Sequence, residues 1–320
     1  MRGVFFIASA AFLWGVSASM GRAVFTGKLS LAGEALHPIE PIILSQTRTT
    51  FSLLVLLPIL LWPKKDGGGW QRIAVPAADL VQCLVLGMLG VAASNYFYYV
   101  AIQKTSVAIA IILQYTAPVW VLLYVVARGQ QRLTFQKVAA VAVAIAGIVF
   151  TIGVVGGKSA APLHLDRWGL IAAMLASFSF AFYNVGGHSI LARYDRWRVL
   201  TWTLVSASVF WLFVNPPWKV AAAHYTSAQW AFLFVFSMIS VLGSFSLYFL
   251  GLQYLEPTRA IIASCLEPVF SILLAAVLLG EGVKPIQTLG IILVLSAIAI
   301  VQLPGREVSG RDAVVVDPIE

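Results

Sequence analysis

An acidic residue stands inside one of the most apolar stretches of this chain, the segment ASCLEPVFSILLAAVLLGE at residues 263–281. Glu267 lies within it, and Pro268 follows directly. A carboxylate in such a segment is costly in a membrane, so it should be protonated, paired with a cation or facing a cavity. We therefore predict a functional role for Glu267, either in binding a ligand or in taking up and releasing protons.

Arg48 is a second charge inside an apolar run, at residues 41–62. If residue 258 is taken as the external end of its span, Glu267 lies about 13 Å in, and Arg48 about 10 Å in from the same side. Two alternatives stay open. The two charges could neutralise each other as a structural ion pair, or both could serve coupling or substrate recognition.

Two prolines occupy equivalent places 150 residues apart, Pro118 and Pro268. Proline removes a helix hydrogen bond and clashes with the carbonyl four residues earlier. The pair predicts two symmetric kinks that act as hinges and line a cavity. The alternative is that both are tolerated prolines without a special role, which are frequent in membrane helices.

Aromatic and amide side chains within the apolar runs could form a polar pocket with aromatic walls. From this set we predict substrate binding by Trp14, Gln114, Tyr115 and Asn184, together with Glu267. The alternative is that these groups form interfacial belts and hydrogen bonds between helices. The other members of this aromatic and amide set are Asn95, Tyr98, Tyr99, Trp120, Tyr183 and Tyr248.

His188 could relay protons or make a single structural hydrogen bond.

The elements that position these residues follow from composition, because 60% of the 320 residues are hydrophobic and only 11% are charged. This composition indicates an all-α integral membrane protein, since about 20 apolar residues as helix cross a bilayer core. The sequence predicts ten such helices, at residues 3–21, 41–62, 78–101, 105–127, 134–155, 167–190, 197–214, 228–251, 258–280 and 284–303.

The net charge is +8, and most basic residues lie in short segments between the apolar runs. That placement favours control of membrane topology over nucleic-acid binding, which we do not expect. Its bias predicts that both termini are cytoplasmic, with Arg259 on the external side. No phosphate-binding motif G-x-x-x-x-G-K-[ST] and no metal-ligand spacing occur, so we expect no cofactor and no metal.

An internal repeat relates residues 95–137 to residues 245–287 without a gap. It predicts two five-helix halves, residues 1–157 and 158–303, followed by a polar cytoplasmic tail at 304–320. Because five is odd, the halves enter the membrane from opposite sides. Such inverted repeats are typical of secondary transporters with a site near the membrane midplane.

Several segments resemble the EamA-type carriers of the drug/metabolite transporter superfamily: FLWGVS (12–17), QTRTTFSLLVLL (46–57), QYTAPVWVLL (114–123), FAFYNVGGH (180–188) and CLEPVFSILLAAVLLGE (265–281). The resemblance implies a bacterial inner-membrane carrier of small organic metabolites, often amino acids or related compounds and often exporting. It also implies a central cavity lined by spans 1, 3, 4, 6, 8 and 9.

The leading hypothesis is therefore a secondary transporter that moves a small metabolite by alternating access, driven by a proton or solute gradient. A channel or a non-transporting partner subunit is the alternative, and a membrane-embedded enzyme is the third hypothesis. The sequence leaves open the substrate, the direction, the coupling ion, and whether the protein is a monomer or a homodimer.

Overall fold

The computed structural model of the chain describes residues 2–25, 30–31, 34–35, 39–62, 69–105, 107–152, 166–279 and 283–303. The predicted tail at 304–320 and the predicted boundary between the halves at residues 157 and 158 lie outside the described residues.

The described residues are almost entirely helical, as the composition predicted. Ten segments are long and apolar enough to span a membrane, so the predicted number of spans is confirmed. The helices are α1 (Arg2–Phe25), α2 (Pro41–Leu61), α3 (Ala77–Val85), α4 (Ala93–Lys104), α5 (Val107–Gln114), α6 (Ala117–Ala127), α7 (Phe135–Ile152), α8 (Arg167–Leu191), α9 (Arg196–Val214), α10 (Pro217–Ala222), α11 (Ser227–Ser237), α12 (Ser244–Leu252), α13 (Pro257–Ser264), α14 (Leu266–Leu279) and α15 (Pro285–Gln302).

The remaining elements are short. A 3-10 helix, η1, covers Gly69–Arg72. The two π-helical segments are η2 (Leu86–Ala92) and η3 (Met238–Gly243). Strands β1 (Ser30–Leu31) and β2 (Glu34–Ala35) form one antiparallel pair.

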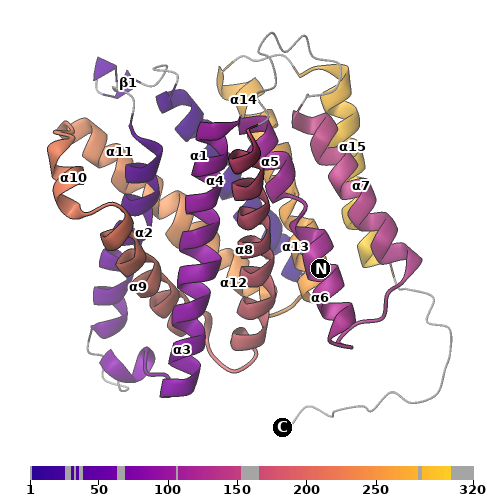
Figure 1. Ribbon diagram of the computed structural model, residues 1–320, viewed down its shortest axis with the longest axis horizontal. Helices are drawn as coiled ribbons and strands as arrows, with labels where there is room; N and C mark the ends of the chain where they lie inside the picture. Colours follow the sequence, from indigo (N-terminus) through magenta and orange to yellow (C-terminus); the bar gives the residue numbers. More distant parts are fainter. Residues whose placement is uncertain are drawn as a thin grey trace.

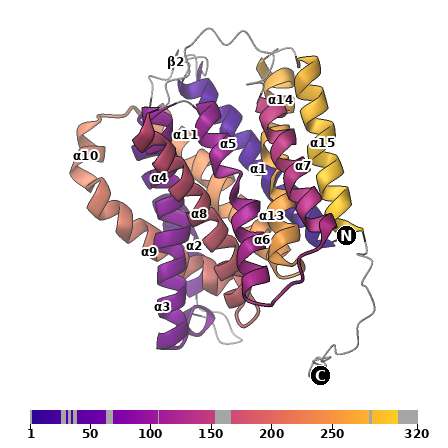
Figure 2. The same cartoon turned by 45° about the vertical axis from the view of Figure 1, so that its right-hand side comes forward.

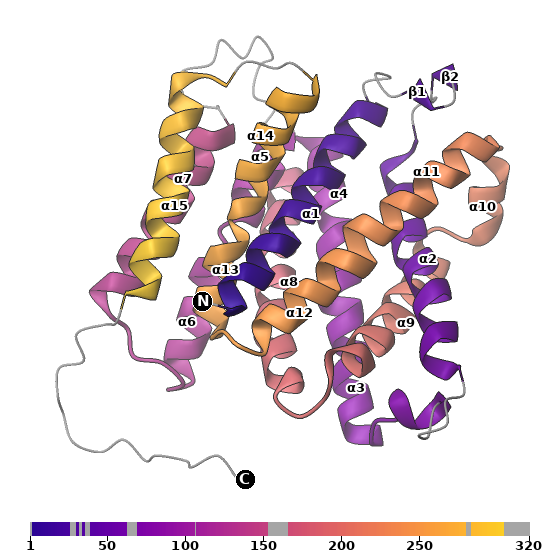
Figure 3. The ribbon, with the colours of Figure 1, turned by 180° about the vertical axis from the view of Figure 1, so that it is seen from behind.

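The helices run side by side, and the long α7 and α15 stand as a pair at one edge (Figures 1 and 2). In the view from behind, α1 crosses beside α12 and α14 (Figure 3). Small residues allow the closest approach, since a Cβ added at Gly290 of α15 would lie 2.3 Å from the Thr151 nitrogen of α7. Without a hydrophobic driving force inside lipid, such close backbone packing is what holds membrane helices together.

The turn between α12 and α13 lies at the end of the bundle where the chain begins. The rings of Phe6 and Tyr254 stack with centroids 6.0 Å apart, and Gly3 packs directly against Leu255. Residue 258 is therefore at the same end as the N-terminus. The prediction that residue 258 and Arg259 lie at the external end, opposite to a cytoplasmic N-terminus, is wrong.

This correction changes how the two buried charges are reached. The chain crosses the membrane once, as α1, before α2 begins, so α2 starts at the end opposite to the N-terminus. Glu267 thus lies about 13 Å from the N-terminal end and Arg48 about 10 Å from the other end. In a bilayer core of about 30 Å, both positions remain in the interior of the membrane.

Four spans depart from regular α-helix, and they do so in corresponding places. Spans 3 and 8 pass through η2 and η3, while spans 4 and 9 are divided into α5–α6 and α13–α14. Pro118 lies in the first turn of α6, and Pro268 is the third residue of α14. The helices are therefore interrupted just before each proline. A first helical turn tolerates proline because its N–H has no intrahelical partner there.

Candidate functional site

The two interrupted spans meet at a hydrogen bond between predicted site residues. Tyr115, the first residue after α5, is buried, and its hydroxyl donates to Oε2 of Glu267 at 2.6 Å. Glu267 is the second residue of α14. The breaks in spans 4 and 9 thus place a phenol and a carboxyl in contact inside the membrane.

Local hydrogen bonds stabilise the backbone at both breaks. At the first, the Thr116 N–H and the Thr116 hydroxyl both donate to the Leu113 carbonyl, at 3.1 and 2.6 Å. At the second, the Cys265 N–H donates to Ile262 at 3.1 Å, and the Ser264 hydroxyl donates to Ile261 at 2.7 Å. In lipid such groups must be satisfied within the protein, so these bonds make the interruptions tolerable.

Arg48 contacts an amide instead of Glu267. Its Nη2 donates to Oδ1 of Asn95, and Nδ2 of Asn95 donates to the Val91 carbonyl at 2.7 Å. Val91 belongs to η2, so Asn95 links the guanidinium to the π-helical segment. Within the described residues no ion pair joins Arg48 to Glu267. The direct contacts of the two charged side chains are therefore with Asn95 and Tyr115 instead of with each other.

This contact makes Asn95 important for stability. Replacing Asn95 by alanine is expected to lower the free energy of unfolding by about 1–3 kcal/mol, because a partly buried guanidinium loses its acceptor. Asn95→Asp keeps an acceptor and is the matched control. Thermal unfolding in detergent measures both variants, and equal losses for the two would contradict the assignment.

Trp14 and Asn184 meet at a different place, around Tyr248. The Trp14 ring lies 5.2 Å from the Tyr248 ring, and its Nε1 donates to the Ser240 carbonyl of η3 at 3.2 Å. Nδ2 of Asn184 donates to the Tyr248 hydroxyl, whereas Oδ1 of Asn184 is buried without a partner. These side chains form a buried helix-packing core in which one amide acceptor is unsatisfied.

Gln114 is the predicted substrate residue with the least constrained side chain. It is the last residue of α5, directly before Tyr115, and it is partly buried. None of the hydrogen bonds described for this part of the chain uses its amide. The structure thus brings Tyr115 and Glu267 into contact and places Trp14 and Asn184 around Tyr248. Gln114 directly precedes Tyr115 in the sequence.

A cavity of about 870 Å³, here called the α3–α6 cavity, lies elsewhere. Residues of spans 3, 4, 6 and 9 line it, while spans 1 and 8 contribute none, in contrast to the expected lining. His188 lies on its wall, and the His188 Nδ1 contacts the Leu252 carbonyl at 3.0 Å, as in the simpler alternative. The lining residues are Gln82, Val85, Leu86, Trp120, Tyr124, Arg128, Gln130, Gln131, Phe178, Ala181, Phe182, Val185, Gly186, His188, Ser189, Ala192, Glu256 and Pro257. The five predicted substrate residues are not among them.

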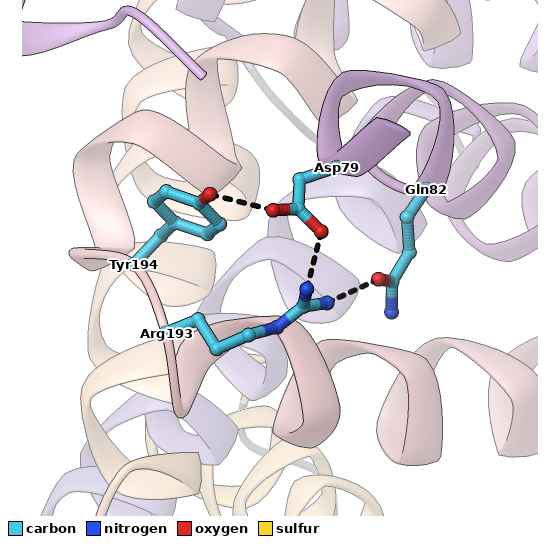
Figure 4. A network of polar contacts seen from close by, with 4 residues as sticks. All are labelled: Asp79, Gln82, Arg193 and Tyr194. Carbon is cyan, nitrogen blue, oxygen red and sulfur yellow. Dashed lines mark hydrogen bonds and ion pairs between the residues drawn. The ribbon is translucent and has the colours of Figure 1, made fainter. Parts of the chain in front are cut away.

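A polar network that the sequence analysis did not predict includes Gln82, one of the lining residues of this cavity (Figure 4). Arg193 pairs with Asp79 and also donates to Gln82 at 2.5 Å, while the Tyr194 hydroxyl donates to Asp79 at 2.6 Å. The network ties the start of α3 to the turn after α8. The sequence did contain a signal for this contact. Asp79 lies at the start of a predicted span, on the same side of the membrane as the basic segment 193–198.

The Tyr194 contact predicts a pH dependence. The hydrogen bond to the Asp79 carboxylate raises the pKa of Tyr194 above its usual value near 10. Because the neutral phenol is favoured in the folded state, this stabilisation is complete below pH 10 and is lost as the pH rises through the raised pKa. Melting temperatures across pH 8–11 should converge for wild type and Tyr194→Phe at the alkaline end. A constant difference would contradict the role of this bond.

Comparison with known proteins identifies the family. A model of the EamA-like transporter family matches residues 1–153 and 167–303, which is most of the chain. The chain belongs to the EamA-like transporter family. It is therefore a multi-pass membrane protein of a transporter family, as the resemblance implied.

Three curated relatives are about a quarter identical to the chain over the aligned residues. The uncharacterized inner membrane transporter YicL of Salmonella typhimurium is 25% identical over 231 residues, covering 71% of this chain and 75% of YicL. An uncharacterized transporter of Archaeoglobus fulgidus is 24% identical over 79% of this chain and 83% of its own length. The threonine/homoserine exporter RhtA of Escherichia coli is 25% identical over 63% of this chain and 65% of RhtA.

A solved crystal structure supports the same architecture. It superposes with a TM-score of 0.71 at 19% sequence identity, covering 94% of this chain and 97% of the other. At this identity the similarity concerns the fold alone.

Proposed function

We propose that this EamA-like protein is a secondary transporter that exports small organic metabolites bearing an ammonium group, such as amino acids, across a bacterial inner membrane. Transport proceeds by alternating access, without a cofactor and without enzymatic chemistry. The observation that carries the proposal is the Tyr115–Glu267 hydrogen bond at the meeting point of two interrupted spans. The name of RhtA, a threonine/homoserine exporter, supports the direction and the solute class.

Glu267 offers one oxygen for exchange. Oε2 accepts the Tyr115 hydroxyl, while Oε1 is without a hydrogen-bond partner in the part of the chain described. A proton or a substrate ammonium can occupy Oε1, and each excludes the other. This competition is the chemical basis of an exchanger, in which a proton entering the cell displaces the ammonium compound leaving it.

The remaining predicted residues have supporting roles in this proposal. Arg48, which binds Asn95 in the interior of the membrane, supplies a positive charge that can stabilise the Glu267 carboxylate when neither proton nor solute is bound. Gln114 supplies amide contacts to the solute beside Tyr115. Trp14 and Asn184 hold the neighbouring helices through Tyr248 and contact the solute in another conformation of the cycle.

Symmetry supports the alternating-access part of the proposal. The family model matches the chain in two segments, and each segment contains one π-helical span followed by one interrupted span. We propose that these are inverted repeats with both termini cytoplasmic, and that the segments before Pro118 and Pro268 are the hinges. Discontinuous spans at the interface of inverted repeats are typical of transporter binding sites.

Reconstitution into lipid vesicles tests the function. Purified protein should accumulate a zwitterionic amino acid such as threonine or homoserine against its gradient when a pH gradient is imposed and no ATP is present. Collapse of the gradient with a protonophore should stop accumulation. Rapid flux that persists without any gradient would favour a channel. Failure of every amino acid and related amine to move would overturn the proposal.

A further inference from the structure

We propose that the α3–α6 cavity binds one membrane phospholipid whose headgroup carries a phosphate and a primary ammonium. The acyl chain lies between α3 and α6 against α8, and the headgroup lies at the helix ends. This site is separate from the Tyr115–Glu267 pair, because neither of those residues lines the cavity.

The shape of the cavity suits a chain that enters from the bilayer. Helices α3 and α6 stand apart on the two sides of α8 at the end where the α8–α9 turn lies (Figures 1 and 2). The lining residues on α8 run from Phe178 to Ser189, and Ala192 lies just past the end of this helix. Phe178 to Ser189 is about 17 Å along a helix. Phe178 and Phe182 are 45% and 41% exposed. A cavity of this depth with accessible rings can accept most of the length of an acyl chain.

The chemistry of the wall changes along the cavity as it does along a lipid. The inner part is apolar and aromatic, and the Trp120 and Phe178 rings stack with centroids 4.1 Å apart. The outer part is polar, and it lies at the helix ends, where the headgroup region of a bilayer begins. The inner residues are Trp120, Phe178, Ala181, Phe182 and Val185, and the outer residues include Gln82, Arg128, Gln130, Ser189 and Glu256.

Two opposite charges at the outer part define the headgroup. Arg128 follows the last residue of α6, and Glu256 precedes the first residue of α13. Among the described residues neither has an ion-pair partner. The planar guanidinium suits a phosphate, while the carboxylate accepts N–H donors from an ammonium. A quaternary ammonium has no N–H to donate, and a glycerol headgroup has no cation. Ethanolamine phospholipids therefore fit best.

Native mass spectrometry of the intact protein tests the site. Wild-type protein in detergent is incubated with equal amounts of palmitoyl-oleoyl phosphatidylethanolamine, phosphatidylcholine and phosphatidylglycerol. Retention of the ethanolamine lipid should exceed that of the others by about two- to five-fold, the range expected for partly exposed charge contacts. Equal retention of the three lipids by the wild type would overturn the proposal without any variant.

Variants at the outer part locate the lipid. Glu256→Gln should remove the preference for ethanolamine over choline, and Arg128→Gln should reduce retention of all three phospholipids. Ser189→Trp should block the site, because Ser189 is exposed at its outer part. Arg132→Gln, four residues after Arg128 in the connection between α6 and α7 and outside the lining, is the matched control and should bind as the wild type does. An unchanged preference in Glu256→Gln, or displacement of the lipid by a transported amino acid, would contradict the assignment.

Discussion

Glu267→Gln is expected to lower pH-driven transport by about 10- to 100-fold, which corresponds to the loss of a hydrogen bond to a charged group of about 1.5–3 kcal/mol. Glutamine keeps the size of the side chain and an acceptor for the Tyr115 hydroxyl, but it cannot take up a proton or carry a negative charge. The residual flux should no longer respond to an imposed pH gradient. Uptake into vesicles at a series of external pH values measures both effects.

Two further variants make this result specific to the site. Tyr115→Phe removes only the hydroxyl that donates to Glu267, so it should weaken transport while preserving its response to pH. Glu40→Gln removes an exposed carboxyl at the start of α2, and it should transport as the wild type does. If Glu267→Gln retained full pH-dependent transport, Glu267 would have a structural role and the proposed exchange mechanism would be wrong.

Gly290→Ala is expected to lower the free energy of unfolding by about 1–3 kcal/mol, the usual cost of forcing extra volume into a packed interface. The added Cβ would lie 2.3 Å from the Thr151 nitrogen and 2.7 Å from the Gly147 carbonyl oxygen. Both contacts are with backbone atoms, so α7 and α15 must separate. Thermal unfolding in detergent measures the loss.

Gly187→Ala is the matched control within another helix. There the nearest atoms to an added Cβ are side-chain carbons of Phe249 and Leu252, at 3.4 and 3.5 Å. This substitution meets ordinary contacts, and alanine is favoured over glycine in a helix by about 1 kcal/mol. Gly187→Ala should therefore be neutral or stabilising. If the two substitutions had the same sign and size, close backbone approach at Gly290 would not be the reason for its effect.

Sequence patterns located the discontinuities of the fold but not their form. Pro118 and Pro268 indicated a disturbed backbone at equivalent places, and the structure has a break near each one. The breaks precede the prolines because a proline fits the first turn of a new helix better than the middle of a continuous one. The π-helical segments had no such marker, because only the neighbouring helices decide where one extra residue is accommodated.

The partners of the charged residues show the same limit. The depths of Arg48 and Glu267 in the membrane, estimated from their residue numbers, suggested that the two charges could pair. In the structure Arg48 contacts Asn95, and Glu267 contacts Tyr115. Depth along a helix is readable from residue numbers, whereas the direction in which a side chain points around the bundle is not. The wrong placement of residue 258 at the end opposite to the N-terminus had a different cause. Counting the predicted crossings from the N-terminus already places residue 258 at the end where the chain begins.

The sequence by itself determined the class of the protein and its ten helices. In lipid each crossing segment must satisfy its own backbone hydrogen bonds, so a sufficiently long apolar run is enough to specify a helix. Only the tertiary structure decided that Tyr115 meets Glu267, that Arg48 binds Asn95, and that Arg128 and Glu256 face one cavity. These contacts join residues far apart in the chain, and they depend on helix rotation and close packing, which local sequence patterns do not encode.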